Sequence, residues 1–128
     1  MKKKTIIHEF DPVIYPYMLW IIVAKEPDVI EEKFNEYTGG RIVFVAGDVD
    51  RSEAFAMPVS IKENPRFGVV IFFRSKKSMS YDIVAHESSH AAKYLFQHIG
   101  SDIKEHEPFE YVIGWIAGCC EKVKKNKV

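Results

Sequence analysis

Two histidines stand four residues apart in the second half of the chain, and a glutamate directly follows the first of them. They are His86 and His90, with Glu87 between them, in the stretch YDIVAHESSHAAKYLF. Side chains at positions i and i+4 of an α-helix lie side by side, so both imidazoles can direct a nitrogen at one ion about 2.0–2.1 Å away, as zinc requires. Glu87 is turned about 100° from His86 around such a helix, which suits a base that holds a water better than a third ligand. The pattern predicts a zinc site with an adjacent general base.

The residues around this motif predict the helix that the zinc geometry requires. Ser78 or Ser80 can cap its start and Gly100 can end it, so the predicted helix covers residues 80–99. Apolar side chains recur along it at helical spacing and form a wide face, and the two histidines lie beside that face rather than on it. The alternative to metal binding is a pair of surface histidines on an amphipathic helix.

A catalytic zinc site needs a third protein ligand and keeps one position open. The HExxHxxGxxH arrangement is excluded, because Lys93 stands at the glycine position and Phe96 at that of the last histidine. His98 lies two turns beyond His90, about 12 Å along the helix axis, and is too far away to bind the same ion. The ligand must therefore come from the region after the motif helix, where the candidates are Asp102, Glu105, His106, Glu107 and Glu110.

A second helix is predicted over residues 109–122, with Pro108 at its first position. The connection before it is short, so the two helices should pack antiparallel, which favours Glu107 and Glu110 as ligands. Gly114 and Gly118 share a helix face with Glu107. Because glycine costs about 1 kcal/mol in a helix relative to alanine, this pair predicts close packing against alanines of the motif helix. The alternative is that both glutamates only favour the positive helix N-terminus.

The first half of the chain carries strand patterns. We expect strands over residues 5–10, 17–24, 41–46, 54–61 and 67–73, a turn at 47–50 and a short helix over 28–34. Pro58 suits an edge strand better than a central one. These patterns predict an α+β fold, a single domain over residues 1–128, in which the last two helices cover one face of a twisted, mainly antiparallel sheet.

Composition limits the classes of partner and location. Lysine plus arginine equals aspartate plus glutamate at 18 each, so no overall charge predicts binding to nucleic acid or to an anionic membrane. The N-terminus lacks the apolar region of a signal peptide, and the longest apolar run, over residues 17–24, is too short to span a membrane. Cys119 and Cys120 are adjacent and are interpreted as buried thiols in a reducing compartment. We expect a cytoplasmic protein.

The stretches HESSH at residues 86–90 and EPFEY at residues 107–111 resemble the small zincin-type metallopeptidases of phages and prophages, and more distantly the ImmA/IrrE family. The resemblance covers roughly residues 67–120. It implies a zincin-like domain and a gluzincin-like set of zinc ligands, His86, His90 and Glu107. Glu110 stands where those families have a small residue, which leaves the choice of third ligand open between Glu107 and Glu110. Glu110 and Tyr111 are also candidates for residues that support the zinc ligands.

The implied reaction is the hydrolysis of a peptide bond in a protein or peptide partner. Bound zinc would lower the pKa of its water to about 7, and Glu87 would take the proton and pass it to the leaving amine. In proteins of this resemblance, a strand such as residues 67–73 forms the edge on which an extended peptide pairs. A hydrogen-bond donor must also stabilise the oxyanion, and the sequence does not choose among Tyr81, His98, His106 and Tyr111 for this role.

Two other classes of function fit the same sequence. The first is a non-catalytic zinc-binding protein of a phage or prophage, with a structural or host-interaction role, which has no use for Glu87. The second is a metal-free binding module that docks a partner on exposed aromatic residues, namely Tyr15, Tyr17, Trp20 and Trp115. The sequence does not predict the oligomeric state.

Overall fold

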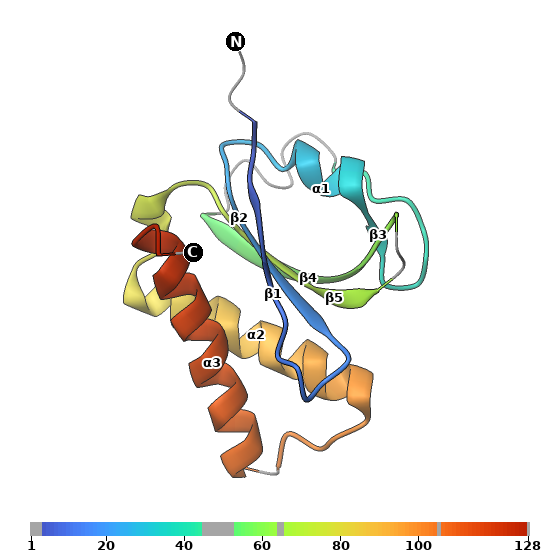
Figure 1. The fold of residues 1–128 in the computed structure, drawn as a ribbon, viewed down its shortest axis with the longest axis vertical. Coiled ribbons are helices and arrows are strands. Elements are labelled where there is room, and N and C mark those ends of the chain that lie inside the picture. The colour runs from blue at the N-terminus through green and yellow to red at the C-terminus, as the bar shows by residue number, and fades with distance from the viewer. Residues whose placement is uncertain (1–3, 45–52, 64–65, 105, 128) are drawn as a thin grey trace.

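A mixed five-stranded sheet forms the centre of the protein in the computed structural model, which describes residues 4–44, 53–63, 66–104 and 106–127. The strands are β1 (Ile7–Phe10), β2 (Met18–Val23), β3 (Phe34–Glu36), β4 (Ala54–Ile61) and β5 (Phe67–Phe73). Their spatial order is β1-β2-β5-β4-β3 (Figure 1). Only β2 and β5 run parallel, and the other three neighbouring pairs are antiparallel. The predicted α+β fold with a mainly antiparallel sheet is therefore confirmed.

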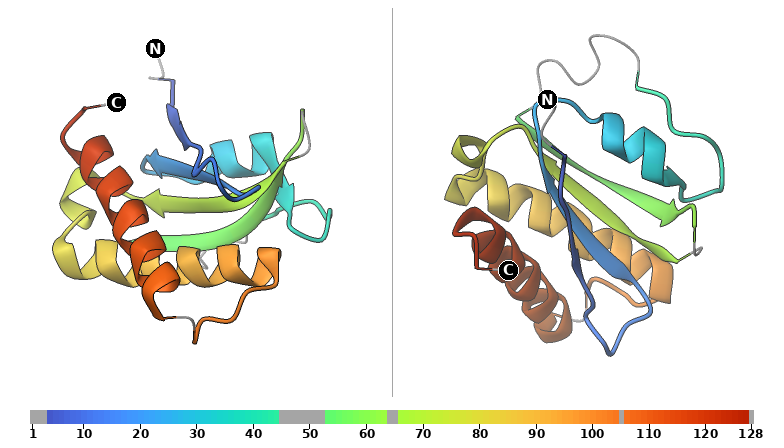
Figure 2. Two further views of the ribbon diagram at one scale, coloured as in Figure 1. Left: turned by 60° about the horizontal axis from the view of Figure 1, so that its bottom comes forward. Right: turned by 45° about the horizontal axis from the view of Figure 1, so that its top comes forward.

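Helices cover both faces of this sheet. Helix α2 (Tyr81–Ile99) and helix α3 (His106–Lys124) lie on one face, and the short α1 (Asp28–Lys33) lies on the other (Figure 2). A single 3-10 turn, η1 (Lys76–Ser78), leads into α2. Two apolar cores follow from the alternation of side chains along the central strands. Leu19, Ile21 and Ile71 point toward α2 and α3, whereas Trp20 and Phe72 point toward α1. The expectation that Tyr17 and Trp20 are exposed for docking is wrong, because both are 1% exposed in these cores.

Helix α2 begins and ends where its sequence predicts. Ser80 is its N-cap residue in an extended conformation, and Gly100 follows its last residue with φ 74°, the left-handed conformation that glycine adopts without strain. The N–H of Gly100 bonds to the carbonyl of Gln97, and the N–H of Ser101 bonds to that of Phe96. Among the described residues, no helix combines the length and the apolar composition that crossing a membrane requires.

The strand predicted over residues 41–46 is wrong for its described part. Over residues 41–44 the structure has only one isolated bridge, between Arg41 and Asn35, and residues 45–46 lie outside the described chain, as does the turn predicted at 47–50. A tight turn at Gly39 and Gly40 explains the difference, since the N–H of Glu36 bonds to the carbonyl of Gly40. The chain reverses there after the short β3, a strand that the sequence patterns did not predict.

The close packing predicted for the two glycines of α3 is also wrong. Nothing lies within 4 Å of a Cβ built on Gly114 or Gly118, and both glycines are exposed. Helix α3 packs through its opposite side, where Val112, Ile116 and Cys120 are buried against the α2 side of the sheet. Because these larger side chains make the contact, the face that carries the glycines turns to solvent.

Both cysteines lie in the buried side of α3, as predicted. Burial raises the pKa of Cys119 to about 11 and that of Cys120 to about 12, because a thiolate is poorly solvated there. Neither thiol is therefore ionised at neutral pH, which fits a packing role rather than a reactive one.

Gly68 is the glycine on which the sheet depends most directly. A Cβ at this position would lie 2.4 Å from the carbonyl oxygen of Met18 and 2.4 Å from the Trp20 ring, both on the neighbouring β2. A side chain here cannot be accommodated without separating β5 from β2.

We predict that Gly68→Ala lowers the free energy of unfolding by about 1–3 kcal/mol, the usual cost of overpacking a core. Urea unfolding in dilute solution measures it. Gly114→Ala is the matched control, because its Cβ meets open space and alanine favours the helix, so this variant should be at least as stable as the wild type. Equal stability of Gly68→Ala and the wild type would contradict the tight approach of β2 and β5.

Candidate metal centre

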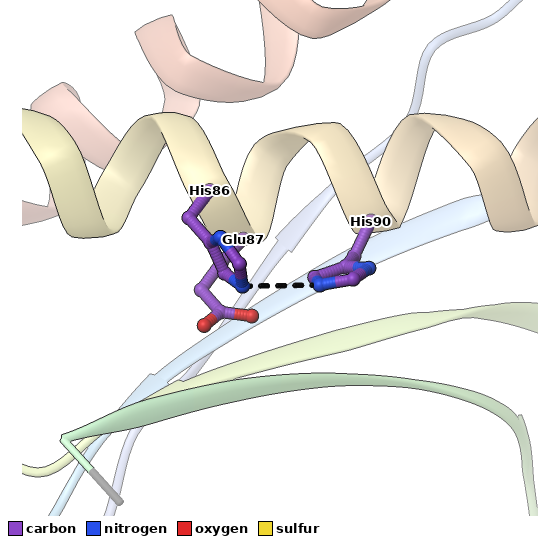
Figure 3. A group of neighbouring side chains, drawn as sticks. All are labelled: His86, Glu87 and His90. Carbon is purple, nitrogen blue, oxygen red and sulfur yellow. Dashed lines mark hydrogen bonds between the residues drawn. The ribbon is translucent and has the colours of Figure 1, made fainter.

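Helix α2 places His86, Glu87 and His90 side by side, with their side chains directed toward β4 and away from α3 (Figure 3). The Nε2 atoms of the two histidines lie 3.1 Å apart. One ligand atom from each of the three residues lies within 4.8 Å of those of the other two. Within the described chain, no other group of three such side chains meets this criterion.

The packing of α2 explains why the histidines project in this direction. The helix buries Ser88, Ala91, Ala92, Leu95 and Phe96 against the sheet. At 100° per residue, His86 and His90 then fall just outside the buried arc, and Glu87 falls at its border. Accordingly, both histidines are exposed, whereas Glu87 is only 7% exposed.

The separation of the two imidazoles fits a shared zinc ion. Two nitrogens bound to one tetrahedral zinc at 2.0–2.1 Å are about 3.3 Å apart, close to the distance between the Nε2 atoms in the structure. Imidazole nitrogens and a carboxylate oxygen are also the donor types that zinc takes in catalytic sites. The distance between the two nitrogens and the donor types of the group are therefore compatible with a shared zinc ion.

The electrostatic environment of Glu87 is set mainly by its burial. Burial raises the pKa of this carboxyl group, and the charges of His86 and His90 oppose the rise. A mostly buried carboxyl group beside two imidazoles, with its pKa raised by burial, is a common arrangement at functional sites.

A cleft of about 380 Å³ opens beside this group. His86 and Glu87 line one part of it, and the rest is formed by Asp82, Ile83, Glu53 and Ala54. Ser78 donates a hydrogen bond from its hydroxyl to Glu53, and the Ser80 hydroxyl donates to Asp82 Oδ1 at 2.6 Å. This last bond lowers the pKa of Asp82. Three carboxyl groups around one cleft create a negative potential that attracts a cation.

The structure does not bring the other predicted ligands to the histidines. Glu107 and Glu110 lie at the start of α3 and are exposed, as is Tyr111. They are absent from the described group that can hold a metal, because α3 packs on the side of α2 opposite to the imidazoles (Figure 3). Asp102 is exposed in the connection between the helices. Glu105 and the side chain of His106 lie outside the described part of the chain.

Three of the predicted oxyanion donors, Tyr81, His98 and Tyr111, are absent from the described lining of the cleft. His98 sits near the end of α2, where its Nδ1 lies 2.6 Å from the hydroxyl of Tyr37 and its ring contacts Tyr17 and Phe67. Tyr81 is exposed, and the Lys124 ammonium lies 5.6 Å from the centre of its ring. These contacts give His98 a role in packing at the end of α2, whereas Tyr81 lies almost free on the surface.

Two acidic residues of the cleft did not follow from the sequence patterns. Asp82 stands four residues before His86, so the helical spacing that links the histidines places it in the same row. Glu53 comes from the segment just before β4, far away in the sequence. Its position depends on the pairing of β4 with β5, which no local pattern predicts.

Comparisons with models of protein families, with curated proteins and with solved structures find no match to this chain.

We predict that Glu87→Gln stabilises the metal-free protein. Replacing a buried carboxylate by a neutral amide of the same shape removes the cost of keeping a charge out of water, and we expect a gain of about 1 kcal/mol in the free energy of unfolding. Thermal unfolding in the presence of a chelator measures this change. Glu26→Gln removes an exposed carboxylate and should change nothing, and a Glu87→Gln variant less stable than the wild type would show that the charge supports the fold.

Proposed function

We propose that the chain is a zinc-dependent metallopeptidase with a zincin-like site, in which His86 and His90 bind the metal and Glu87 acts as general base. The observation that carries the proposal is the 3.1 Å separation of the two Nε2 atoms, with the Glu87 carboxylate in the same group. The acidic cleft beside them supports it, since it attracts a cation and leaves room for a substrate.

The third ligand is the part of this proposal on which the resemblance and the structure differ. The resemblance to phage zincins implies Glu107, which lies exposed on α3. Glu53 lies in the wall of the cleft that also contains His86, and it comes from a different element. Asp82 is a poorer candidate, because it precedes His90 by two turns of the same helix, about 12 Å along the axis. Glu53 is also outside the group of three, and its carboxylate accepts a hydrogen bond from Ser78, so its side chain would have to turn to reach the ion. We therefore place Glu53 beside Glu107 as a candidate third ligand.

Glu87 carries the proton transfers in this scheme. Zinc bound at the histidines would act as a Lewis acid that lowers the pKa of a bound water to about 7. Glu87 is partly shielded from solvent and stands next to both ligands, so it can accept a proton from the attacking water. The same carboxyl group then protonates the leaving amine. Because the peptide nitrogen leaves as a neutral amine, the glutamate returns to its ionised form.

The edge of β4 is the place where we propose that an extended peptide lies. The prediction that residues 67–73 form this edge is wrong, because β5 is paired on both sides, with β2 and with β4. Within the described residues, β3 pairs only with Val59, Ser60 and Ile61, so no strand pairs with the outer side of Ala54–Pro58. The strand order places β4 between β5 and β3, so the edge strand predicted for Pro58 is wrong, although at Pro58 itself only the β5 side is paired among the described residues. Ala54 lines the cleft beside His86, so a peptide added to this edge would pass the site.

Zinc binding tests the ligands directly. We predict about one zinc ion per chain for the wild type by elemental analysis. His86→Ala and His90→Ala should each lose at least ~100-fold in zinc affinity, because mutating even a residue that only hydrogen-bonds a ligand typically lowers metal affinity by about 10–100-fold. His98→Ala is the matched control, because it removes a histidine of the same helix that lies outside the group. Comparing Glu53→Gln with Glu107→Gln identifies the third ligand. Equal zinc binding by all three histidine variants would contradict the proposal.

Cleavage of a peptide library, detected by mass spectrometry, tests catalysis. We predict that Glu87→Gln keeps its zinc but cleaves at least ~100-fold more slowly, the usual contribution of a general base. If zinc binds at the two histidines and Glu87→Gln behaves like the wild type in every functional assay, the chain is the non-catalytic zinc-binding protein instead.

A further inference from the structure

The outward face of α3 has no partner within the described chain. It carries Glu107, Tyr111, Gly114 and Gly118, all exposed, and Tyr111 is 74% exposed. At 100° per residue these positions share one face, and the buried residues of α3 lie on the other. Helix α3 lies along the outside of the molecule, so this face is open to another molecule (Figures 1 and 2).

An apolar groove continues this face toward the connection between β1 and β2. It has a volume of about 320 Å³ and is lined by Ile14 and Tyr15 on one side and by Pro108, Tyr111 and Trp115 of α3 on the other. Ile14 is 78% exposed and its neighbour Val13 is 83% exposed. Large apolar side chains gathered in this way on a surface are typical of a protein interaction site.

The two glycines are unexplained by the packing of a single chain. Each weakens the helix by about 1 kcal/mol relative to alanine, and no atom of the described residues lies within 4 Å of the missing Cβ position. Glycines on an exposed helix face allow the backbone of a second helix to approach closely.

The charges on α3 indicate which second helix fits. The helix is acidic at its start, with Glu107 and Glu110. It is basic at its end, with Lys122 in the last turn and Lys125 directly after the helix. All four residues are exposed, and the Lys125 ammonium also lies 3.1 Å from Glu121 Oε1 of its own chain. The helix dipole favours this distribution in any helix, so charge alone does not select a partner. The spacing is more specific, because these charges lie symmetrically about the midpoint between the two glycines.

A two-fold axis beside the outward face, at the height of Ile116 along the helix, sets an identical helix antiparallel to the first. Gly114 then faces Gly118 of the second copy, and Gly118 faces its Gly114. The same operation sets Glu107 opposite Lys125, once on each side of the axis. Glu110 and Lys122 reach the same height but lie on opposite flanks of the helix pair, so they do not face one another. Such a face is self-complementary in both shape and charge, which is the condition for an isologous dimer interface.

We propose that the outward face of α3 is a homodimer interface, in which two α3 helices pack antiparallel at Gly114 and Gly118, with the apolar groove at their flanks. The imidazoles of the metal centre point away from α3, so both clefts stay open in this dimer. One pair of helices buries little area, and the association should therefore be weak, in the micromolar range.

Charge reversal tests this arrangement with matched variants. Sedimentation equilibrium of the full chain, with a chelator present to exclude bridging by metal, should show a monomer–dimer equilibrium. Glu107→Lys alone and Lys125→Glu alone each place like charges opposite one another twice in the dimer, so each should weaken association at least ~10-fold. In an equimolar mixture of the two variants, the heterodimer has opposite charges at both positions, and dimerisation should return.

The control pair is Glu26→Lys mixed with Lys93→Glu, which reverses exposed charges away from α3 and should dimerise like the wild type in every combination. Gly118→Gln provides a second variant whose side chain meets open space in the monomer, so it should fold normally by circular dichroism yet lose association. A wild type that is monomeric at all concentrations would overturn the proposal. A dimer that persists unchanged in Gly118→Gln and in both single reversals would overturn it as well.

Discussion

The packing of α2 on the sheet is the constraint on which the candidate centre depends. The helix must bury Ala91, Leu95 and Phe96 against the central strands, and once this face is fixed the helical repeat decides where every other side chain of α2 points. His86 and His90 leave the buried arc together on the side of β4, whereas α3 occupies the other side of α2. A rotation of α2 by one residue would bury a histidine and expose a core residue. The free energy of core packing therefore holds the two imidazoles at their separation.

This arrangement links the metal centre to the edge of the sheet. β4 contributes Ala54 to the cleft, and its small side chain leaves the space between the strand and the histidines open. Glu87 lies at the border of the core, where burial limits its contact with water while one side stays in reach of the cleft. A carboxylate in that position costs stability, and such a cost is common where a residue serves binding or catalysis. The outward face of α3 lies away from this cleft, so the proposed association and the proposed metal site share no residue other than Glu107.

Local sequence patterns predicted the features that depend on a single helix. They did not predict the features that depend on the order in which the strands pair. The ends of α2, its N-cap at Ser80 and the pairing of His86 with His90 follow from residues close in sequence, and the structure has them as predicted. The position of Glu53 and the central place of β5 depend on long-range pairing, which no local pattern encodes. A glycine pair predicts the close approach of another helix but does not indicate which helix, so the predicted contact of Gly114 and Gly118 with α2 is wrong. The larger apolar side chains on the opposite face of α3 make the contact with the core and leave the glycines exposed.

The claim that most needs a direct test is that one metal ion sits between His86 and His90. Anomalous scattering at the zinc absorption edge, from crystals of the zinc-loaded protein, locates the ion without reference to activity. We expect one strong peak about 2.0–2.1 Å from the Nε2 atoms of both histidines, with a carboxylate oxygen completing the protein ligands. A peak elsewhere on the chain, or no peak after soaking in zinc while the histidines keep their mutual hydrogen bond, would contradict it.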